Sequence, residues 1–184
     1  MCGITGFCDF NKQSDELILE DMTAALHHRG PDDEGHRVIK SQLATVGLGH
    51  KRLSVLDLSI NGHQPMSYKG LEIVYNGEIY NYKEIKFELI EAGYSFVSDT
   101  DTEVLLKAFH KWGLNSIKKL NGMYAFSVYD KNHNKLYLVR DRVGVKPLYF
   151  YRKEGLILFS SELKSFHQHP RFKKKICNSG LSLY

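Results

Sequence analysis

Short strands joined by polar turns dominate the last third of this chain and constrain its fold most. Apolar runs surround two clusters of turn-forming residues, 130–134 and 152–155. Each cluster has the length and composition of a β-hairpin connection. Hairpins join antiparallel strands, whereas parallel strands need long crossovers. The pattern therefore predicts antiparallel sheets rather than a parallel stack of βαβ units, with strands at 125–129, 136–140, 148–151 and 156–159.

Helical periodicity lies between the strand regions. A first helix is expected to begin at Ser14–Glu16 and to stop at Gly30–Pro31, with Gly30 as its C-cap. A second is expected after Asn81, with Glu84 as its capping-box partner. Two more are expected at 100–113 and 161–168, and strands at 4–10, 38–39, 44–48 and 71–75.

Two stretches carry turn formers instead of a regular period. Residues 32–35 and the long stretch 49–69 are expected to be irregular, and long irregular connections are often functional. The strand at 71–75 is expected to end at Asn76–Gly77, since that dipeptide is a strong turn signal. Strands and hairpins with helices grouped between them predict one α+β domain.

Composition narrows the class of protein. The 184 residues are 42% hydrophobic, enough for one domain with a core, and contain no apolar run of the roughly 20 residues that a membrane helix needs. No signal peptide is apparent, and three cysteines without a CxxC pair predict a reducing, cytoplasmic setting without a zinc site. The net charge of +4 is partly local to the basic tail, Arg171 and 173–175, so nucleic acid is not an expected partner. The sequence contains no Walker A or GxGxxG motif, so no nucleotide site is expected.

Cys2 directly follows the initiator methionine. Removal of Met1 would leave one residue with both a thiol and an α-amine. An α-amine titrates at about 7.7–8.0 and a free thiol at about 8.5, so such an amine can accept the thiol proton. Position alone also allows a small buried cysteine in an N-terminal strand.

Four motifs in loops or at element ends carry the groups that a hydrolase of an amino-acid amide requires. Arg52 can bind an α-carboxylate, and Glu78 and Asp101 can bind an α-ammonium group. Asn76 and Gly77 offer a side-chain amide and a backbone N–H for an oxyanion hole.

Each motif also has a structural interpretation. Asn76–Gly77 could be a tight turn, Asp101 a helix-dipole partner, and Arg52 a surface residue. We interpret 29–32 as a helix stop and 140–147, with its charged residues and proline, as an ion-paired turn. Spacing alone does not choose between these interpretations.

The motifs taken together resemble the glutamine amidotransferase domain of the asparagine synthetase family, a class II amidotransferase of the N-terminal-nucleophile hydrolases. The matching runs occur in family order and extend from residue 2 to about 170. They are CGITGF, HRGPD, GHKRLSVLD, YNGEIYNY, SDTDTEV, LNGMYAFSVYD, RDRVGVKPLY and FSSELKSF.

The resemblance implies a four-layer αββα sandwich of two antiparallel sheets and a role for each site residue. Cys2 would attack the amide of glutamine with its own amine as base, and Asn76 and Gly77 would form the oxyanion hole. The substrate would be held by Arg52, Leu53, Val55, Glu78 and Asp101. The products would be glutamate and ammonia.

The resemblance also implies a missing half. Family members continue into a synthetase domain that binds ATP and magnesium, and we expect residues 1–184 to be an amidotransferase domain truncated at its C-terminal end, with no cofactor of its own. The expected partners are glutamine and a synthetase domain or subunit that amidates aspartate. Two alternatives stay open: an acceptor that is a sugar acid of surface polysaccharide, and an inactive glutamine-binding module.

Overall fold

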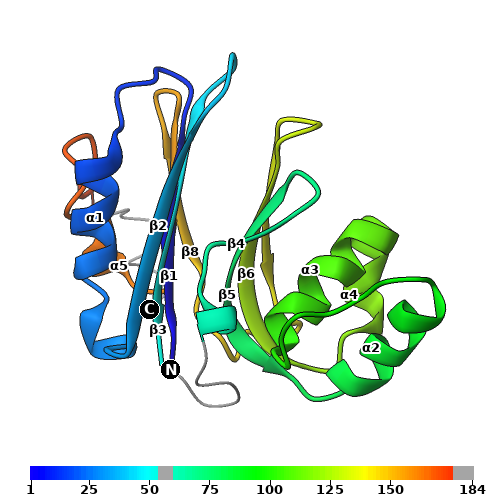
Figure 1. Ribbon diagram of the computed structural model, residues 1–184. Coiled ribbons are helices and arrows are strands. Elements are labelled where there is room, and N and C mark those ends of the chain that lie inside the picture. Colours follow the sequence, from blue (N-terminus) through cyan, green and yellow to red (C-terminus); the bar gives the residue numbers. More distant parts are fainter. Residues whose placement is uncertain (54–59, 176–184) are drawn as a thin grey trace.

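Two antiparallel sheets lie face to face between two layers of helices (Figure 1). The computed structural model describes residues 1–53 and 60–175. The first sheet contains β1 (Gly3–Asp9), β2 (Asp33–Lys40), β3 (Thr45–Arg52), β8 (Tyr149–Lys153) and β9 (Leu156–Ser160). The second contains β4 (Met66–Tyr68), β5 (Leu71–Ile79), β6 (Gly122–Asp130) and β7 (Lys135–Arg140).

Helices cover the outer face of each sheet. On the first sheet lie α1 (Glu16–Ala24) and α5 (Leu163–Phe166), and on the second lie α2 (Tyr82–Glu91), α3 (Asp101–Trp112) and α4 (Ser116–Lys119). Three short 3-10 turns complete the described elements: His27–Arg29, Ile60–Gly62 and Gly113–Asn115. The predicted αββα sandwich is therefore confirmed.

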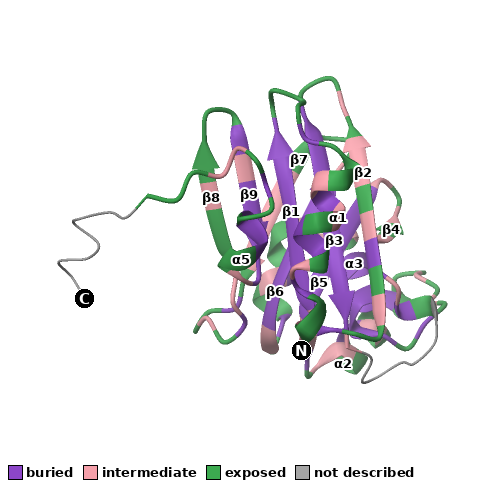
Figure 2. Ribbon diagram, turned by 90° about the vertical axis from the view of Figure 1, so that its left-hand side faces the viewer, coloured by how far each residue is buried: buried purple, intermediate pink, exposed green. Residues whose placement is uncertain are grey.

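The strand orders are β2-β3-β1-β9-β8 and β4-β5-β6-β7, and neighbours pair antiparallel throughout. Both predicted hairpins are present, as β6–β7 and β8–β9. Figure 2 shows that β1 and β3 are buried along their length, whereas the edge strand β8 is largely exposed. The N-terminal strand is thus held at the centre of its sheet.

Alternation along the strands separates three apolar cores. Ile4 and Cys8 of β1 face the space between the sheets, and Phe7 faces α1. In β5, Val74 faces that same inter-sheet space, whereas Ile73 and Tyr75 face the helices. Since side chains alternate along a strand, Asn76 shares the inter-sheet face with Val74.

Several predicted bounds were wrong. Residues 33–35 belong to β2, and β3 extends to Arg52, because these two strands pair from Asp33 opposite Arg52 to the far end. The stretch 49–69, expected to be irregular, contains β4 and the end of β3. Likewise β5 does not end at Asn76–Gly77 but continues to Ile79, since β6 supplies a partner along its whole length.

The helix termini gave mixed outcomes. Asp15 caps α1 by accepting from the Ile18 N–H at 3.1 Å, but α1 ends at Ala24 and a 3-10 turn separates it from Gly30. Asn81 makes no side-chain cap to α2. Its amide instead accepts from the Asn121 N–H at 2.9 Å and donates to the Lys119 carbonyl at 2.9 Å, contacts that no local pattern predicts.

The basic tail is not wholly solvated. Arg171 forms an ion pair of 2.8 Å with Asp9, whose carboxylate is buried and also accepts from the Ser14 hydroxyl. Burial alone would raise the pKa of Asp9, but hydrogen bonds from Ser14 and Arg171 outweigh burial and lower it. Residues 173–175 are exposed, as predicted.

Candidate active site

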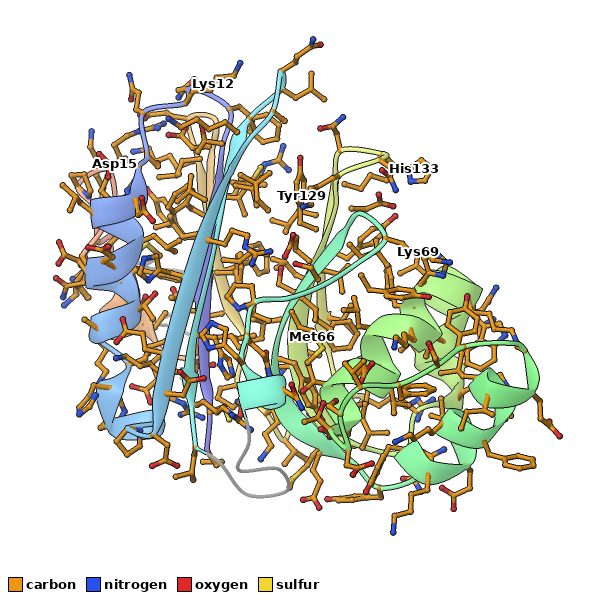
Figure 3. The ribbon with its side chains drawn as sticks, in the orientation of Figure 1. Lys12, Asp15, Met66, Lys69, Tyr129 and His133 are labelled. Carbon is orange, nitrogen blue, oxygen red and sulfur yellow. The ribbon has the colours of Figure 1, made fainter. Side chains whose placement is uncertain are left out.

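A cavity of about 240 Å³ opens at the end of the sandwich where the chain begins. Figure 1 shows the N-terminus at the lower end of the first sheet. In Figure 3, Lys12 and His133 lie at the opposite end. The volume is below the about 300–1,000 Å³ of typical small-molecule sites, which suits a compact ligand.

The cavity brings together seven of the eight residues that the sequence singled out. They come from the residue before β1, the end of β3 and the residue after it, β5 of the other sheet, and the first turn of α3. They are Cys2, Arg52, Leu53, Asn76, Gly77, Glu78 and Asp101. The eighth, Val55, lies outside the described residues. The proximity of these residues is established by the structure, and their chemical roles remain predictions.

Cys2 immediately precedes β1 and lies against the end of β3. Its Sγ accepts from the Leu53 N–H at 3.4 Å and lies 3.7 Å from the Leu53 carbonyl. The next residue, Gly3, pairs with Lys51 and packs against Leu26, where an added Cβ would lie 3.1 Å from the Leu26 Cβ. The thiol is therefore fixed in position, and the residue is half-buried rather than sealed in the core.

Arg29, interpreted from sequence as part of a helix stop, holds the backbone of Cys2. Its Nε donates to the Cys2 carbonyl at 2.9 Å, and its Nη1 forms an ion pair of 2.9 Å with Glu162. Burial alone would raise the pKa of Glu162, but hydrogen bonds from Arg29 and His28 lower it. Glu162 is therefore an ionised partner for Arg29. No local signal marked this contact, because Arg29 and Glu162 are far apart in sequence.

Asn76 presents an unused donor to the cavity. The residue is 2% exposed, and its Nδ2 has no hydrogen-bond partner in the described part of the chain. Buried amide donors are normally paired, so an unpaired one beside a cavity suits a ligand acceptor. The structure rejects the tight-turn alternative, since Asn76 pairs with Ala125 within β5 and β6.

Gly77 is required by close packing of the strands. A Cβ at this position would lie 2.7 Å from the Tyr124 Cα and 2.8 Å from the Tyr75 ring. Such distances are too short for real Cβ contacts, so any side chain would force β5 away from β6. Glycine therefore lets the backbone lie against the cavity.

Arg52 is buried, which rejects the interpretation as a surface arginine. It ends β3, and the backbone of Gly62 packs directly against its guanidinium group. The Asp32 N–H donates to the Arg52 carbonyl at 3.1 Å. The guanidinium is thus held on the cavity wall, where a carboxylate can meet it bidentately.

Asp101 serves α3 and the cavity together. It is the first residue of α3, after Thr100 caps the helix by accepting from the Glu103 N–H at 3.2 Å. Its Oδ2 accepts from the Tyr75 hydroxyl at 2.6 Å and the Ile79 N–H at 3.0 Å. Burial raises the pKa of Asp101 above its ordinary value despite these hydrogen bonds.

Gln64, Tyr75 and His50 form a support that sequence reasoning missed. Gln64 accepts from the Tyr75 N–H at 2.7 Å and donates to the Thr102 hydroxyl at 3.2 Å. His50 Nε2 donates to the Tyr75 carbonyl at 3.1 Å across the two sheets. Burial lowers the pKa of His50 to about 3, so this donor is a neutral ring. The strand that carries Asn76 is therefore fixed on both sides.

The whole length of the chain matches a family model described as a glutamine amidotransferase domain, residues 1–184. The chain belongs to this family. The amidotransferase domain is 44% identical to asparagine synthetase (glutamine-hydrolyzing) 3 of Bacillus subtilis, over 99% of this chain and 30% of that protein. It is 41% identical to asparagine synthetase (glutamine-hydrolyzing) 1 of the same organism, over 90% of this chain and 26% of that protein.

A solved structure shares the fold of the amidotransferase domain. Glutamine phosphoribosylpyrophosphate amidotransferase of Bacillus subtilis superposes with a TM-score of 0.73 at 21% identity, covering 90% of this chain and 43% of that one. This likeness concerns the fold alone. The chain spans between 26% and 36% of the length of the first curated relatives it matches.

One group in the described residues has the composition of a metal site, and it lies away from the cavity. His36 Nε2 lies 3.5 Å from Glu16 and 3.3 Å from Glu20. The other ring nitrogen of His36 is buried without a partner, whereas a metal-bound histidine normally donates through that nitrogen. The cluster therefore fits a polar contact between α1 and β2. In the described residues no helix is long and apolar enough to cross a membrane.

Proposed function

We propose that this amidotransferase domain hydrolyses the side-chain amide of glutamine, with Cys2 as nucleophile once Met1 has been removed. The observation that carries the proposal is the unpaired, buried Nδ2 of Asn76 in the same cavity as the Cys2 thiol. An acyl-transfer site needs a nucleophile and a donor that waits for the developing oxyanion.

The charged residues of the cavity wall suit the α-carboxylate and α-ammonium groups of a free amino acid. Arg52 supplies a cation for the α-carboxylate, and Glu78 and Asp101 supply carboxylates for the α-ammonium group. The Asp101 carboxylate accepts from the Tyr75 hydroxyl and from the Ile79 and Thr102 N–H groups, and a carboxylate has about four hydrogen-bond sites, so one remains for the ammonium group. The side chain of glutamine would then extend toward Cys2.

The chemistry balances with groups of this chain and one water. The Cys2 sulfur attacks the amide carbon while its proton passes to the α-amine, and the carbonyl electron pair moves to oxygen. Asn76 Nδ2 and the Gly77 N–H stabilise that oxyanion. The amine returns the proton to the departing nitrogen, the C–N bond breaks, and ammonia leaves. Water then cleaves the thioester to glutamate and restores the thiol.

We further propose that the ammonia amidates aspartate in a synthetase domain with ATP and magnesium. The names of the similar proteins support this step, and the chain covers less than half of their length. Because that domain is outside this chain, its acceptor is tested on the full protein. Amidation of a sugar acid instead of aspartate would replace this step and leave the glutaminase step intact.

A comparison of Cys2 with Cys8 provides the test. Cys8 is buried in β1, and burial together with Asp9 raises its pKa to about 11, so its thiol is unreactive. Glutamate release should be lost in Cys2→Ala and retained in Cys8→Ala, in protein shown by intact mass to lack Met1. Equal activity of Cys2→Ala and the wild type would reject the proposal. No activity in any form would favour the non-catalytic glutamine-binding module.

A further inference from the structure

Lys146 is a buried lysine in the wall of the active-site cavity. It is 6% exposed, and it lines the cavity together with Met1 and Cys2. Its backbone is fixed on both sides: its N–H donates to Asp141 at 2.9 Å, and its carbonyl accepts from Arg140 Nε at 2.7 Å. From sequence, this segment was interpreted as an ion-paired turn, so the direction of the side chain is a finding of the tertiary structure.

The ammonium group of Lys146 has no anionic partner within ion-pair distance in the described residues. Its Nζ contact is the Met1 sulfur at 3.5 Å, and a thioether is a weak acceptor. Asp141 does not neutralise it, since that carboxylate accepts from the N–H groups of Val145, Lys146 and Tyr124. Burying an unpaired charge is unfavourable, so such a charge beside a cavity indicates a functional role.

The position of Met1 shows which group lies close to the charge of Lys146. Its sulfur is joined to the nitrogen of Cys2 through five covalent bonds, so that nitrogen lies within roughly 9 Å of Lys146 Nζ. Removal of Met1 turns the nitrogen into the α-amine of Cys2. On the basis of the proposed function, we propose that Lys146 is a positioning residue that acts through Cys2 and keeps its α-amine unprotonated at neutral pH.

Electrostatics gives the direction and size of the effect. A nearby cation disfavours a second positive charge, so the α-amine should lose its proton at lower pH. At about 9 Å and an effective dielectric constant of about 20, the displacement is roughly one pH unit. Ordinary α-amines are mostly protonated at pH 7, and that displacement would leave about half to two thirds of them free to act as bases.

Other charged groups face the same space from each surrounding element. Arg29 lies behind the Cys2 carbonyl with its charge paired to Glu162, and Asp141 is held by backbone N–H groups. The remaining groups on the cavity wall are Arg52 from β3, Tyr75 and Glu78 from β5, and Asp101 from α3. A neutral substitution of Lys146 therefore has to be compared with a variant that keeps a positive charge at this position and leaves the other groups unchanged.

The test measures the titration of the Cys2 α-amine directly, by NMR of protein that lacks Met1 and carries 13C,15N-labelled cysteine. The variants are Lys146→Met, Lys146→Gln and Lys146→Arg, and exposed Lys118 on α4 provides Lys118→Met as a control for net charge. Both neutral variants should move the midpoint of the α-amine titration up by about one pH unit, and the acid limb of kcat/KM for glutamate release should move with it. Lys146→Arg and Lys118→Met should follow the wild type.

Coincident profiles of wild type and the neutral variants would overturn the inference, as would a Lys146→Arg profile that follows Lys146→Met. A synthetic Cys-Gly-Ile-Thr peptide serves if a neutral variant does not fold, because the wild-type midpoint should then lie about one unit below that of the peptide. The α-amine titration needs no turnover. Displaced midpoints without glutamate release would support Lys146 and reject the proposed glutaminase, so the two failures are distinguishable.

Discussion

Strand β5 buries a carboxylate at Glu72 and an amide at Asn76, and the two ends of the strand use them differently. Glu72 has a partner at each oxygen: Oε2 accepts from Arg37 at 2.7 Å and Ser67 at 2.6 Å, and Oε1, which makes no hydrogen bond of good geometry, lies 2.7 Å from the Lys131 ammonium as an ion pair. Asn76 leaves its Nδ2 unpaired at the cavity.

The difference separates structural from functional polar groups. Arg37 of β2 reaches Glu72 of β5, so this contact joins the two sheets at the end opposite the cavity. In Figure 3, Tyr129 and His133 lie toward that same end. A buried polar group whose partners are all supplied by the chain holds the fold. A buried donor left unpaired beside a cavity is available to a ligand.

The largest expected effect is on Asn76. Asn76→Ala should lower kcat about 10²–10³-fold with little change in KM, because the donor acts on the oxyanion of the transition state. Ser127, which is also buried with an unpaired hydroxyl but does not line the cavity, provides the control Ser127→Ala. Steady-state glutamate release measures both, and equal losses in the two variants would contradict the assignment.

Arg52→Lys is expected to rank second. Lysine keeps the charge but loses the bidentate geometry for a carboxylate, so KM should rise about 10- to 100-fold with kcat changed less. Arg37→Lys makes the equivalent change at the opposite end of the sandwich and should leave KM unaltered. A KM for Arg52→Lys equal to that of the wild type would show that the substrate carboxylate lies elsewhere.

Glu72→Gln should affect stability instead of catalysis. The amide cannot pair with two cations, so the free energy of unfolding should fall by about 1–3 kcal/mol while kcat/KM is retained. Urea titration measures the loss. Glu88→Gln, which breaks an exposed 2.7 Å pair with Lys119, should change stability by no more than about 1 kcal/mol. Loss of activity in folded Glu72→Gln would remove the distinction between the two ends.

Tyr75→Phe should have the smallest effect on activity, and the direction in which its pH profile moves is informative. The Tyr75 hydroxyl favours ionised Asp101, whose pKa burial already raises. Deleting the hydroxyl should raise that pKa further, so the acid limb of kcat/KM should move to higher pH if Asp101 must be ionised to hold the substrate ammonium. Tyr129→Phe, which removes a 3.1 Å contact to Asn134 at the other end, should leave the profile unchanged. A displacement to lower pH in Tyr75→Phe would contradict the role of Asp101.

Local sequence patterns predicted the helices and strands better than they predicted the contacts between distant residues. The hairpins were predictable because turn chemistry lies within a few residues of both strands. Asn81 is the N-cap residue of α2, as predicted, but its side chain does not cap the helix because its amide binds Asn121 and Lys119 instead, residues distant in sequence. The strand end at Asn76–Gly77 was wrong for a related reason: β6 offers pairing partners that outweigh the local turn preference.

The sequence by itself determined the sheet class, because periodicity is a local property of the chain. Its motifs determined the family and, through the resemblance, seven residues that meet at the cavity. Only the tertiary structure decided that Arg29 holds the Cys2 backbone, that His50 and Gln64 fix Tyr75, and that Lys146 lies beside Met1. These contacts join residues far apart in sequence, and long side chains reach their partners in directions that the packing of two sheets sets. The same packing decides which buried polar groups find partners and which, like Asn76 Nδ2, are left for a ligand.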